Sequence, residues 1–462
     1  MLSVLHKLHA FLAQAGFPAR WDRVGGARPA VESLGLLGLA LMALSLGLGN
    51  TGQSIGMGLL FIASLCAWRH LWSGLKEDWV ARAVVAGFCL VLLRTLWAAL
   101  EMPGLAAEHW DRARVISRVL AFPLACWWLG GSLRSVKSVC ILVLAGAVIN
   151  IVYYGNWARV DSLALTQRLW FGGDPRMEGL LHASILAGMI AFARSWWGHP
   201  ASRLAFFARV MLWLALYLLM VWALIAVQAR AAWIATALTG LLFFGWFVWN
   251  TLRSRGGRRP RFEFALACVL LAGTGIMLAA FANTIGHRLL EDHGEFAISI
   301  DGEVTHVEDL SVATRIYLAQ AGWHGWLRKP LFGWGPGSGR YYIAHADIPA
   351  GFRGFSDFHN NYLDMLMRFG VVGMILFGAF WGVLITRFVV GLRAGKMPAS
   401  LGGFGISICL IFFVVNFTDT YIDFQFGWYY MLLLCALLHS PLMRLHRDGD
   451  SAPTRQNSAS PA

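Results

Sequence analysis

The stretch FHNNYLDMLMRFGVVGMILFGAFWGVLITRFVV, residues 358–390, decides the fold because a polar entrance leads directly into a long apolar run. From about residue 364 the run exceeds the roughly 20 residues that an α-helix needs to cross a bilayer. Ahead of it, residues 285–361 form a polar island that interrupts a long series of apolar segments. The stretch therefore predicts membrane-spanning helices with a chemically active loop at one face of the membrane.

The composition agrees with a membrane protein. Hydrophobic residues make up 58% of the chain and charged residues only 14%, whereas soluble domains have about 25% charged residues. A chain that stays apolar between its loops must satisfy its backbone polar groups internally, which favours helices. The short alternating segments of a membrane β-barrel are not seen. We predict an all-α polytopic membrane protein, and no nucleic-acid partner despite the net charge of +13.

The apolar segments predict about twelve transmembrane helices. Their approximate bounds are 31–49, 53–70, 79–98, 114–131, 136–154, 178–197, 204–226, 230–250, 262–284, 364–390, 401–418 and 424–440. With this count, the arginine-rich loops 251–261 and 387–396 and the start of the C-terminal tail all fall on one side. Because basic loops face the cytoplasm, both termini are predicted there, and the 285–361 loop faces outward.

Five regions follow from these bounds. They are a cytoplasmic segment at 1–30 with an interfacial helix, transmembrane helices 1–9 at 31–284, the large outer loop at 285–361, transmembrane helices 10–12 at 362–440, and a disordered cytoplasmic tail at 441–462. The interfacial helix is predicted because Leu5, Leu8 and Leu12 recur at helical spacing beside basic residues. The tail is rich in Ser, Ala, Pro and Asp, a composition typical of disorder.

No cofactor and no metal site are predicted. All seven cysteines lie within apolar segments and none in the polar island, so we expect neither a disulfide framework nor cysteine-based metal binding. The acidic residues between 291 and 309 are interpreted as a solvated loop. The glycine run at 333–339 follows no strand of a βαβ unit. It is instead interpreted as a tight turn that brings the loop back over the bundle.

Three outer arginines are candidates for binding an anion. Arg176 enters the sixth predicted span ahead of Glu178 and His182, Arg230 sits in a tight link between two spans, and Arg315 lies on a predicted helix ending near 327. Arginine binds phosphate oxygens bidentately and remains charged. The alternatives are that Arg230 snorkels to lipid headgroups and that Arg315 is only solvated.

His359 is the candidate for proton transfer. It stands at the entrance of the span that starts near 364, and Asn360 or Asn361 can cap that helix. A histidine beside several arginines suits a pocket in which a hydroxyl attacks a phosphate-linked lipid. The alternative is that His359 only belongs to a polar helix entrance. His345 and Asp347 are weaker candidates in the same loop.

Several of these segments together resemble a known family. They are Arg230-Ala-Ala-Trp233, Ser311-x-x-x-Arg315, Gly333-Trp-Gly-Pro-Gly337 and His359-Asn-Asn-Tyr-Leu363, followed by Phe369-Gly-Val-Val-Gly373. The set resembles the O-antigen ligase / O-antigen polymerase superfamily, from about residue 165 onward. One departure is Met367-Arg368 before Phe369, where many relatives carry an acid.

The resemblance is strongest to lipopolysaccharide O-antigen ligases, and it implies the following expectations. The fold is a multi-spanning glycosyltransferase that uses a lipid-linked donor in the bacterial inner membrane. A glycan passes from undecaprenyl diphosphate to lipid A–core on the periplasmic face, without a metal and with inversion. Arg230 and Arg315, and less closely Arg176, would bind the donor diphosphate, and His359 would engage the acceptor hydroxyl. His182, Asn360 and Asn361 would support the acceptor.

Three other functions remain open on the sequence. An O-antigen polymerase would use the same donor, and a related ligase would attach the glycan to protein. A transporter or lipid flippase would also have many spans, but the apolar segments carry few ionisable residues near their centres. The charge gathers at one face instead, which suits a one-sided reaction among membrane lipids.

Overall fold

Within the residues that the computed structural model describes, the regular secondary structure is helical and no strand occurs. The described residues are 29–76, 78–155, 157, 168–197, 202–253 and 310–450, with a few isolated positions between 274 and 286. The predicted interfacial helix, most of the span at 262–284 and the acidic segment 291–309 lie outside them. The prediction of an all-α architecture is confirmed.

The helices run in the following order. They are α2 (Pro29–Ser45), α3 (Asn50–Cys66), α4 (Trp68–Leu75), α5 (Trp79–Glu101), η2 (Pro103–Leu105), α6 (Ala106–Ser117), η3 (Arg118–Ala121), α7 (Phe122–Leu129), α8 (Leu133–Tyr154), α9 (Pro175–Trp197), α10 (Arg203–Ala226), α11 (Arg230–Arg253), α14 (Leu310–Arg328), α15 (Ser338–Ala344), η5 (Ala350–Phe352), α16 (Asn361–Arg393), α17 (Ala399–Val415), η6 (Tyr421–Asp423) and α18 (Gln425–Asp450).

Within the described part of the chain, six helices are long and apolar enough to cross a membrane, and α3 with α4 makes a seventh if they form one bent span. The six are α5, α8, α10, α11, α16 and α18, while α2 and α17 are apolar but shorter. The protein is therefore a polytopic membrane protein. The count of twelve stays a prediction, because α9 is less apolar and the span at 262–284 is largely undescribed.

Three predicted spans differ in detail from the structure. The span at 53–70 is two helices bent by 88° around Ala67. The span at 114–131 is broken into α6, the 3₁₀ turn η3 and α7, whose second position is Pro123. A proline fits the first turn of a helix but cannot continue the preceding one, which explains this break.

The third difference concerns the C-terminal tail. α18 continues through Pro441 to Asp450, so the tail is helical ten residues beyond the predicted boundary at 440. The apolar side chains that follow the proline account for this, since Leu442 packs against the core and Met443 is buried within it. Tertiary packing of this turn outweighs the helix-breaking tendency of proline.

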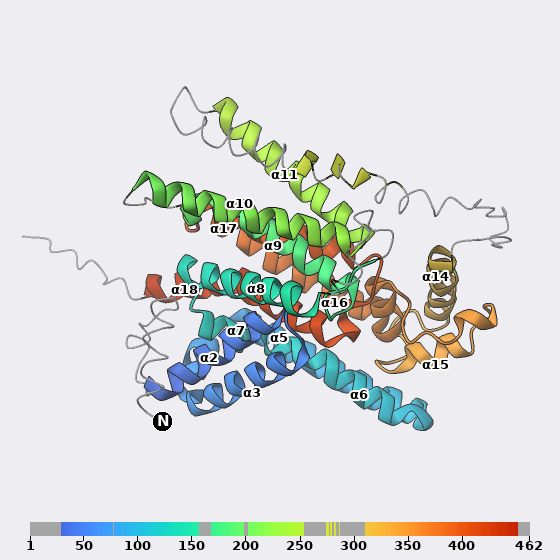
Figure 1. Cartoon of the computed structure of the whole chain (residues 1–462). Helices are drawn as coiled ribbons and strands as arrows, with labels where there is room; N and C mark the ends of the chain where they lie inside the picture. The colour runs from blue at the N-terminus through green and yellow to red at the C-terminus, as the bar shows by residue number, and fades with distance from the viewer. Residues whose placement is uncertain are drawn as a thin grey trace, which may run out of the picture.

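The helices alternate in direction between two ends of the bundle. At one end His439 of α18 contacts Asp78 at the start of α5 at 2.6 Å, and the Arg387 guanidinium lies 4.5 Å from the Trp79 ring. At the opposite end the Asn361 amide donates to the Asn416 carbonyl. α14 and α15 lie beyond this second end of the bundle (Figure 1). We call it the site end.

The glycine run docks against a kink in α16. Gly370 has φ 64° and ψ −165°, which breaks the helix locally. Beside it the Trp334 amide donates to the Met367 carbonyl at 2.7 Å and the Gly335 amide to the Arg368 carbonyl at 2.9 Å. The Gly333 carbonyl accepts from Arg94 of α5 at 2.7 Å. The interpretation of this run as a tight turn over the bundle is confirmed.

We expect Gly333→Ala to destabilise the protein. Gly333 has φ +66°, and a Cβ there would lie 2.5 Å from the Met367 carbonyl oxygen. A left-handed conformation alone costs a non-glycine residue about 1–2 kcal/mol, and the clash with backbone adds to that cost. Thermal unfolding of the purified protein in detergent measures the effect. Gly354→Ala is the control because a Cβ there meets nothing within 4 Å; equal melting temperatures for the two variants would contradict the prediction.

Candidate functional site

The entrance of α16 is capped by Asn360. Its side-chain oxygen accepts from the backbone amides of Tyr362 at 3.0 Å and Leu363 at 3.1 Å, as in a standard helix N-cap. The cap predicted from the sequence is thus confirmed for Asn360. Asn361 is buried, and its backbone amide ties the start of α16 to the end of α17. Both asparagines position the loop that ends in His359.

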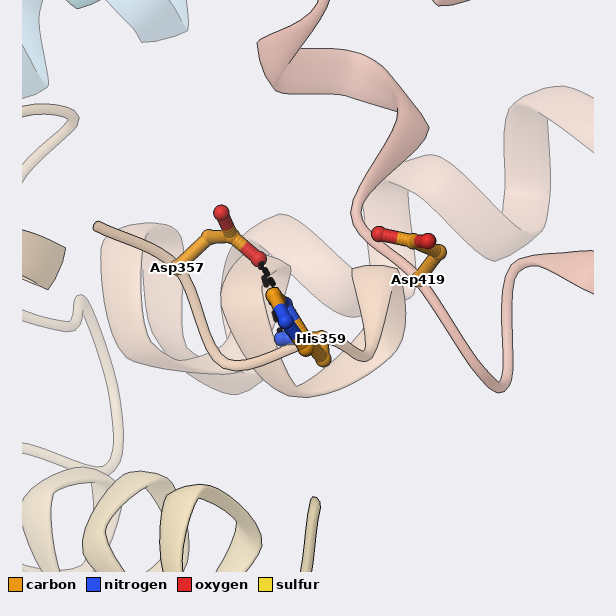
Figure 2. Close-up of side chains that lie close together, drawn as sticks. All are labelled: Asp357, His359 and Asp419. Carbon is orange, nitrogen blue, oxygen red and sulfur yellow. Dashed lines mark hydrogen bonds and ion pairs between the residues drawn. The ribbon is translucent and has the colours of Figure 1, made fainter. Parts of the chain in front are cut away.

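His359 is held by Asp357. Both the backbone amide and the ring Nδ1 of His359 contact the same carboxylate oxygen of Asp357, at 3.1 and 2.7 Å (Figure 2). The backbone of His359 has φ +51°, which is uncommon for a residue other than glycine. The two bonds to Asp357 help to offset the energetic cost of this conformation. Because a carboxylate only accepts, Nδ1 carries a proton and the neutral ring keeps a lone pair at Nε2.

A second carboxylate, that of Asp419, lies beside the pair (Figure 2). One oxygen of each acid and one nitrogen of His359 lie within 4.8 Å of one another. Burial raises the pKa of Asp357, but the hydrogen bond and the charge of His359 outweigh it, so this pKa lies below its ordinary value. Burial raises the pKa of Asp419, an effect that nearby Arg176 only partly offsets.

This cluster has the donor types of a small metal site, yet its charges favour another role. Arg176 lies 2.8 Å from Asp419. One carboxylate oxygen of Asp357 already accepts a hydrogen bond from His359 Nδ1–H. A divalent cation would therefore face a guanidinium at close range. We expect the activity of the purified protein to be unchanged after treatment with EDTA and removal of the chelate. A loss of activity that Mg²⁺ or Mn²⁺ restores would assign these three residues to a metal instead.

Arg176, from the first turn of α9, reaches the same cluster. It contacts Asp174 at 2.7 Å as well as Asp419, and its side chain is about 30% exposed. Its guanidinium also lies 5.9 Å from the Phe424 ring. The structure therefore brings Arg176 and His359 to one site through Asp419. Its two acidic partners share the charge of Arg176, and its predicted contact with the donor diphosphate stays a prediction.

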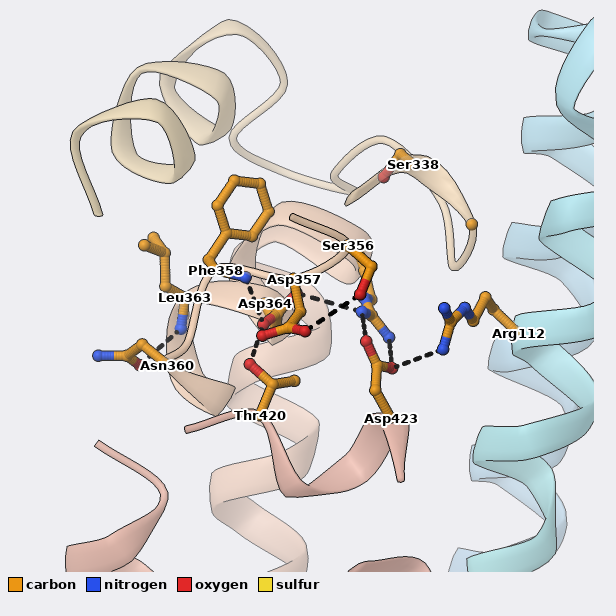
Figure 3. A network of polar contacts seen from close by, with 12 residues as sticks. Arg112, Ser338, Ser356, Asp357, Phe358, Asn360, Leu363, Asp364, Thr420 and Asp423 are labelled. Atoms are coloured by element: carbon orange, nitrogen blue, oxygen red, sulfur yellow. Dashed lines mark hydrogen bonds and ion pairs between the residues drawn. The ribbon is translucent and has the colours of Figure 1, made fainter. Parts of the chain in front are cut away.

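A buried ionic network lies next to Asp357 of this cluster (Figure 3). Arg368 of α16 donates to both oxygens of Asp423 and, at 3.1 Å, to Asp364 one helical turn earlier. Asp364 also accepts from the Thr420 hydroxyl and from the Phe358 amide. The network thus fixes the backbone immediately before His359.

Sequence reasoning did not identify this network. Arg368 was noted only as a departure from a family pattern, and the acids of the short link at 419–423 were not considered. Arg112 of α6, 3.7 Å from Asp423, was also missed, and Figure 3 shows it reaching toward that acid from a neighbouring helix. The available signal was the pair of acids in a short outer link beside an arginine inside an apolar segment.

The other two predicted arginines lie at the site end but on other elements. Arg230 begins α11, directly after the link whose Gln228 carbonyl accepts from Arg168 at 3.3 Å. α9 packs closely on this link. The close approach is seen at Gly179 of α9, where an added Cβ would lie only 2.6 Å from the Ala229 side chain. Arg230 therefore lies close to the start of α9, where Arg176 is found.

Arg315 lies on α14, which packs against α16. A Cβ on Gly322 of α14 would lie 2.6 Å from Leu363 and 3.0 Å from Phe358, on either side of His359 in the sequence. The side chains of Arg230 and Arg315 are both half-buried. Their roles in binding the donor stay predictions.

The remaining sequence candidates are placed away from the cluster. His182 is 1% exposed inside the bundle, where its ring meets the edge of Phe171. Its side chain packs in the interior, and its predicted contact with an acceptor stays a prediction. His345 is exposed, and its Nδ1 contacts the Tyr341 carbonyl. Asp347 is exposed too, as are Arg328, Arg340 and Arg353.

Residues 214–378 match a family model described as O-antigen ligase. This match supports the O-antigen ligase superfamily for that part of the chain. The match contains Arg230, Arg315 and His359 together with the glycine run and the kink of α16. No curated protein matches the chain.

The matched segment is shorter than the resemblance predicted from the sequence, which extended from about residue 165 onward. It leaves Arg176, Asp419 and Asp423 outside. The match supports a membrane enzyme of glycan transfer in general, with a lipid-linked glycan and a lipid-anchored acceptor as the general class of partners. It does not separate ligases from polymerases.

Proposed function

We propose that this protein transfers a glycan from undecaprenyl diphosphate to lipid A–core at the periplasmic face of the bacterial inner membrane. The observation that carries the proposal is the pairing of His359 with Asp357. It fixes the ring tautomer and leaves Nε2 as the basic atom of a side chain that is 15% exposed at the site end. A base so placed is suited to deprotonate a sugar hydroxyl.

The reaction needs one base and a stabilised leaving group. The acceptor hydroxyl would attack the anomeric carbon of the donor sugar while His359 Nε2 takes its proton. A new glycosidic bond forms as the bond between the anomeric carbon and the diphosphate oxygen breaks. Attack opposite the leaving group inverts the anomeric configuration, and undecaprenyl diphosphate departs.

The arginines of the site end supply the positive charge for this step. Arg230 and Arg315, with Arg176 as a third candidate, would hold the diphosphate as negative charge develops on it. Arginine suits this role because its planar guanidinium binds phosphate oxygens bidentately without losing its charge. The gathering of arginines at one end of the bundle supports a reaction on a single membrane face rather than transport across it.

We expect Asp357→Asn to lower the transfer rate by about 10²-fold or more. An asparagine amide can donate to Nδ1 and so favour the tautomer that carries its proton on Nε2, which removes the basic atom from the acceptor side. In the Ser-His-Asp triad the corresponding change lowers kcat by about 10⁴-fold for this reason. Initial rates with a lipid-linked donor and purified lipid A–core measure the effect.

Asp347→Asn is the matched control, since this exposed acid lies in the same loop and outside the cluster. Both variants should be purified in equal yield. If Asp357→Asn transferred glycan as fast as Asp347→Asn, the proposed orienting role of Asp357 would be wrong.

The proposed function is tested by complementation. Cells that make lipid-linked O-antigen polymer and a compatible core, but lack their own ligase, would express this chain. Restored O-antigen ladders on a lipopolysaccharide gel are the expected result, with bare lipid A–core in cells expressing His359→Ala. Absence of ladders with the unchanged chain, at normal expression, would argue against a ligase.

Two further assays then separate the remaining transferases. Longer glycans on the lipid carrier itself, in cells lacking a polymerase, would identify a polymerase. A glycan attached to protein would identify a protein-directed ligase.

A further inference from the structure

An apolar cavity of about 340 Å³ lies among α8, α9, α10, α17 and α18. Its wall is built from aliphatic and aromatic side chains such as Val143, Ile185 and Phe404. Two of the three hydroxyls in the wall, Ser184 and Tyr430, bond each other at 2.6 Å and therefore offer little to a polar ligand. A cavity of this character stays dry unless an apolar group enters it.

Among the described residues, the one charged side chain that lines the cavity is Lys137 of α8. Its ammonium donates to the Ser195 hydroxyl of α9 at 2.7 Å, at the mouth of the cavity. Arg134 is exposed one turn earlier on α8, and residues three apart share a helix face. The wall also reaches the surface at Ile141, which is exposed.

This basic mouth lies at the end of the bundle away from the glycan-transfer site. Arg176 belongs to the first turn of α9 and Ser195 to its last turn. At about 1.5 Å per residue, roughly 28 Å of helix separates them, close to the thickness of a bilayer core. A ligand whose anionic head sits at Lys137 therefore enters from the membrane face opposite to His359.

We propose that this cavity binds one acyl chain of an anionic phospholipid, with the phosphate paired to Lys137 and Arg134. The charge complementarity selects the occupant, because an apolar cavity with cations only at its mouth fits an amphiphile with a negative head. The lipid-linked donor does not fit this arrangement, since its diphosphate is needed at the site end. The inference stands apart from the proposed glycan transfer and survives if that function is wrong.

Native mass spectrometry of the detergent-purified full chain tests this proposal. The protein is titrated with palmitoyl-oleoyl phosphatidylglycerol, or with phosphatidylcholine carrying the same acyl chains. We expect one retained phosphatidylglycerol and much weaker retention of phosphatidylcholine. Lys137→Gln should weaken retention about fivefold, since one basic residue at a membrane surface contributes about 1 kcal/mol. Lys396→Gln, at another exposed lysine, should leave retention unchanged.

A second variant tests the cavity itself. Cys140 lines it, so Cys140→Trp fills the space and should abolish retention. Cys89→Trp is the control because Cys89 is exposed on α5 and lies outside the cavity wall. Equal retention of the two lipids, unchanged retention in Lys137→Gln, or a retained species with the mass of a polyprenyl lipid would each overturn the proposal. If Cys140→Trp does not fold, the lysine variant still decides it.

Discussion

His359→Ala is expected to lower the glycan-transfer rate by about 10²- to 10⁴-fold, the usual contribution of a positioned general base. The side chain is 15% exposed and its Nδ1 lies 2.7 Å from Asp357, so removal of the ring takes away the proposed base. Folding should be little affected, because Asn360 and the Asp364 network hold the loop independently of the ring. Initial rates in detergent, together with the melting temperature, measure both effects.

His345→Ala provides the matched control for this experiment. It removes a histidine from the same loop, where the ring is exposed and contacts the Tyr341 carbonyl and ring. Its rate should remain within about twofold of the unchanged protein, since exposed substitutions away from such features have small effects. A His359→Ala variant that retained more than a tenth of the rate would show that His359 is not the base.

Arg368→Met is expected to destabilise the protein by about 3–5 kcal/mol, the range for removal of one partner from a buried ion pair. The Arg368 side chain is 2% exposed, and its partners Asp364 and Asp423 are 0% and 4% exposed. Methionine would leave Asp364 buried without Arg368 as its cation, and Asp423 with the more distant Arg112 at 3.7 Å. Unfolding of the purified protein by SDS in mixed micelles measures the free-energy difference.

Two comparisons make this result specific. Arg393→Met removes an exposed arginine from the last turn of the same helix and should change stability by less than about 0.5 kcal/mol. Arg368→Met combined with Asp423→Asn should be less destabilised than Arg368→Met alone, because one unpaired charge is removed with its partner. If Arg368→Met unfolded at the same SDS fraction as the unchanged protein, the network would not stabilise the fold.

Loss of Arg368 should also affect the position of His359. The Phe358 amide donates to Asp364, so the residue before His359 is fixed by the same carboxylate that Arg368 holds. Loss of Arg368 should therefore reduce transfer even in the fraction of protein that remains folded. The site thus depends on a network of which three members, Asp364, Arg368 and Thr420, are buried in the described structure.

The amino-acid sequence by itself determined the class of the protein. The apolar runs and the scarcity of charge require helices in a bilayer, because backbone polar groups find no other partners there. Local chemistry also determined the cap at Asn360 and the turn at Gly333, since each depends on residues that are near neighbours in the chain. His359 stood out because a histidine at the mouth of an apolar helix is unusual.

Only the tertiary structure decided what surrounds His359. Asp419 and Arg176 come from two separate segments of the chain and meet His359 through one set of contacts. His182 shows the converse, since a polar residue near an outer loop became part of the packed interior. Whether a charged side chain binds a ligand or another side chain depends on which helices pack together, and apolar spans of similar composition do not specify their neighbours.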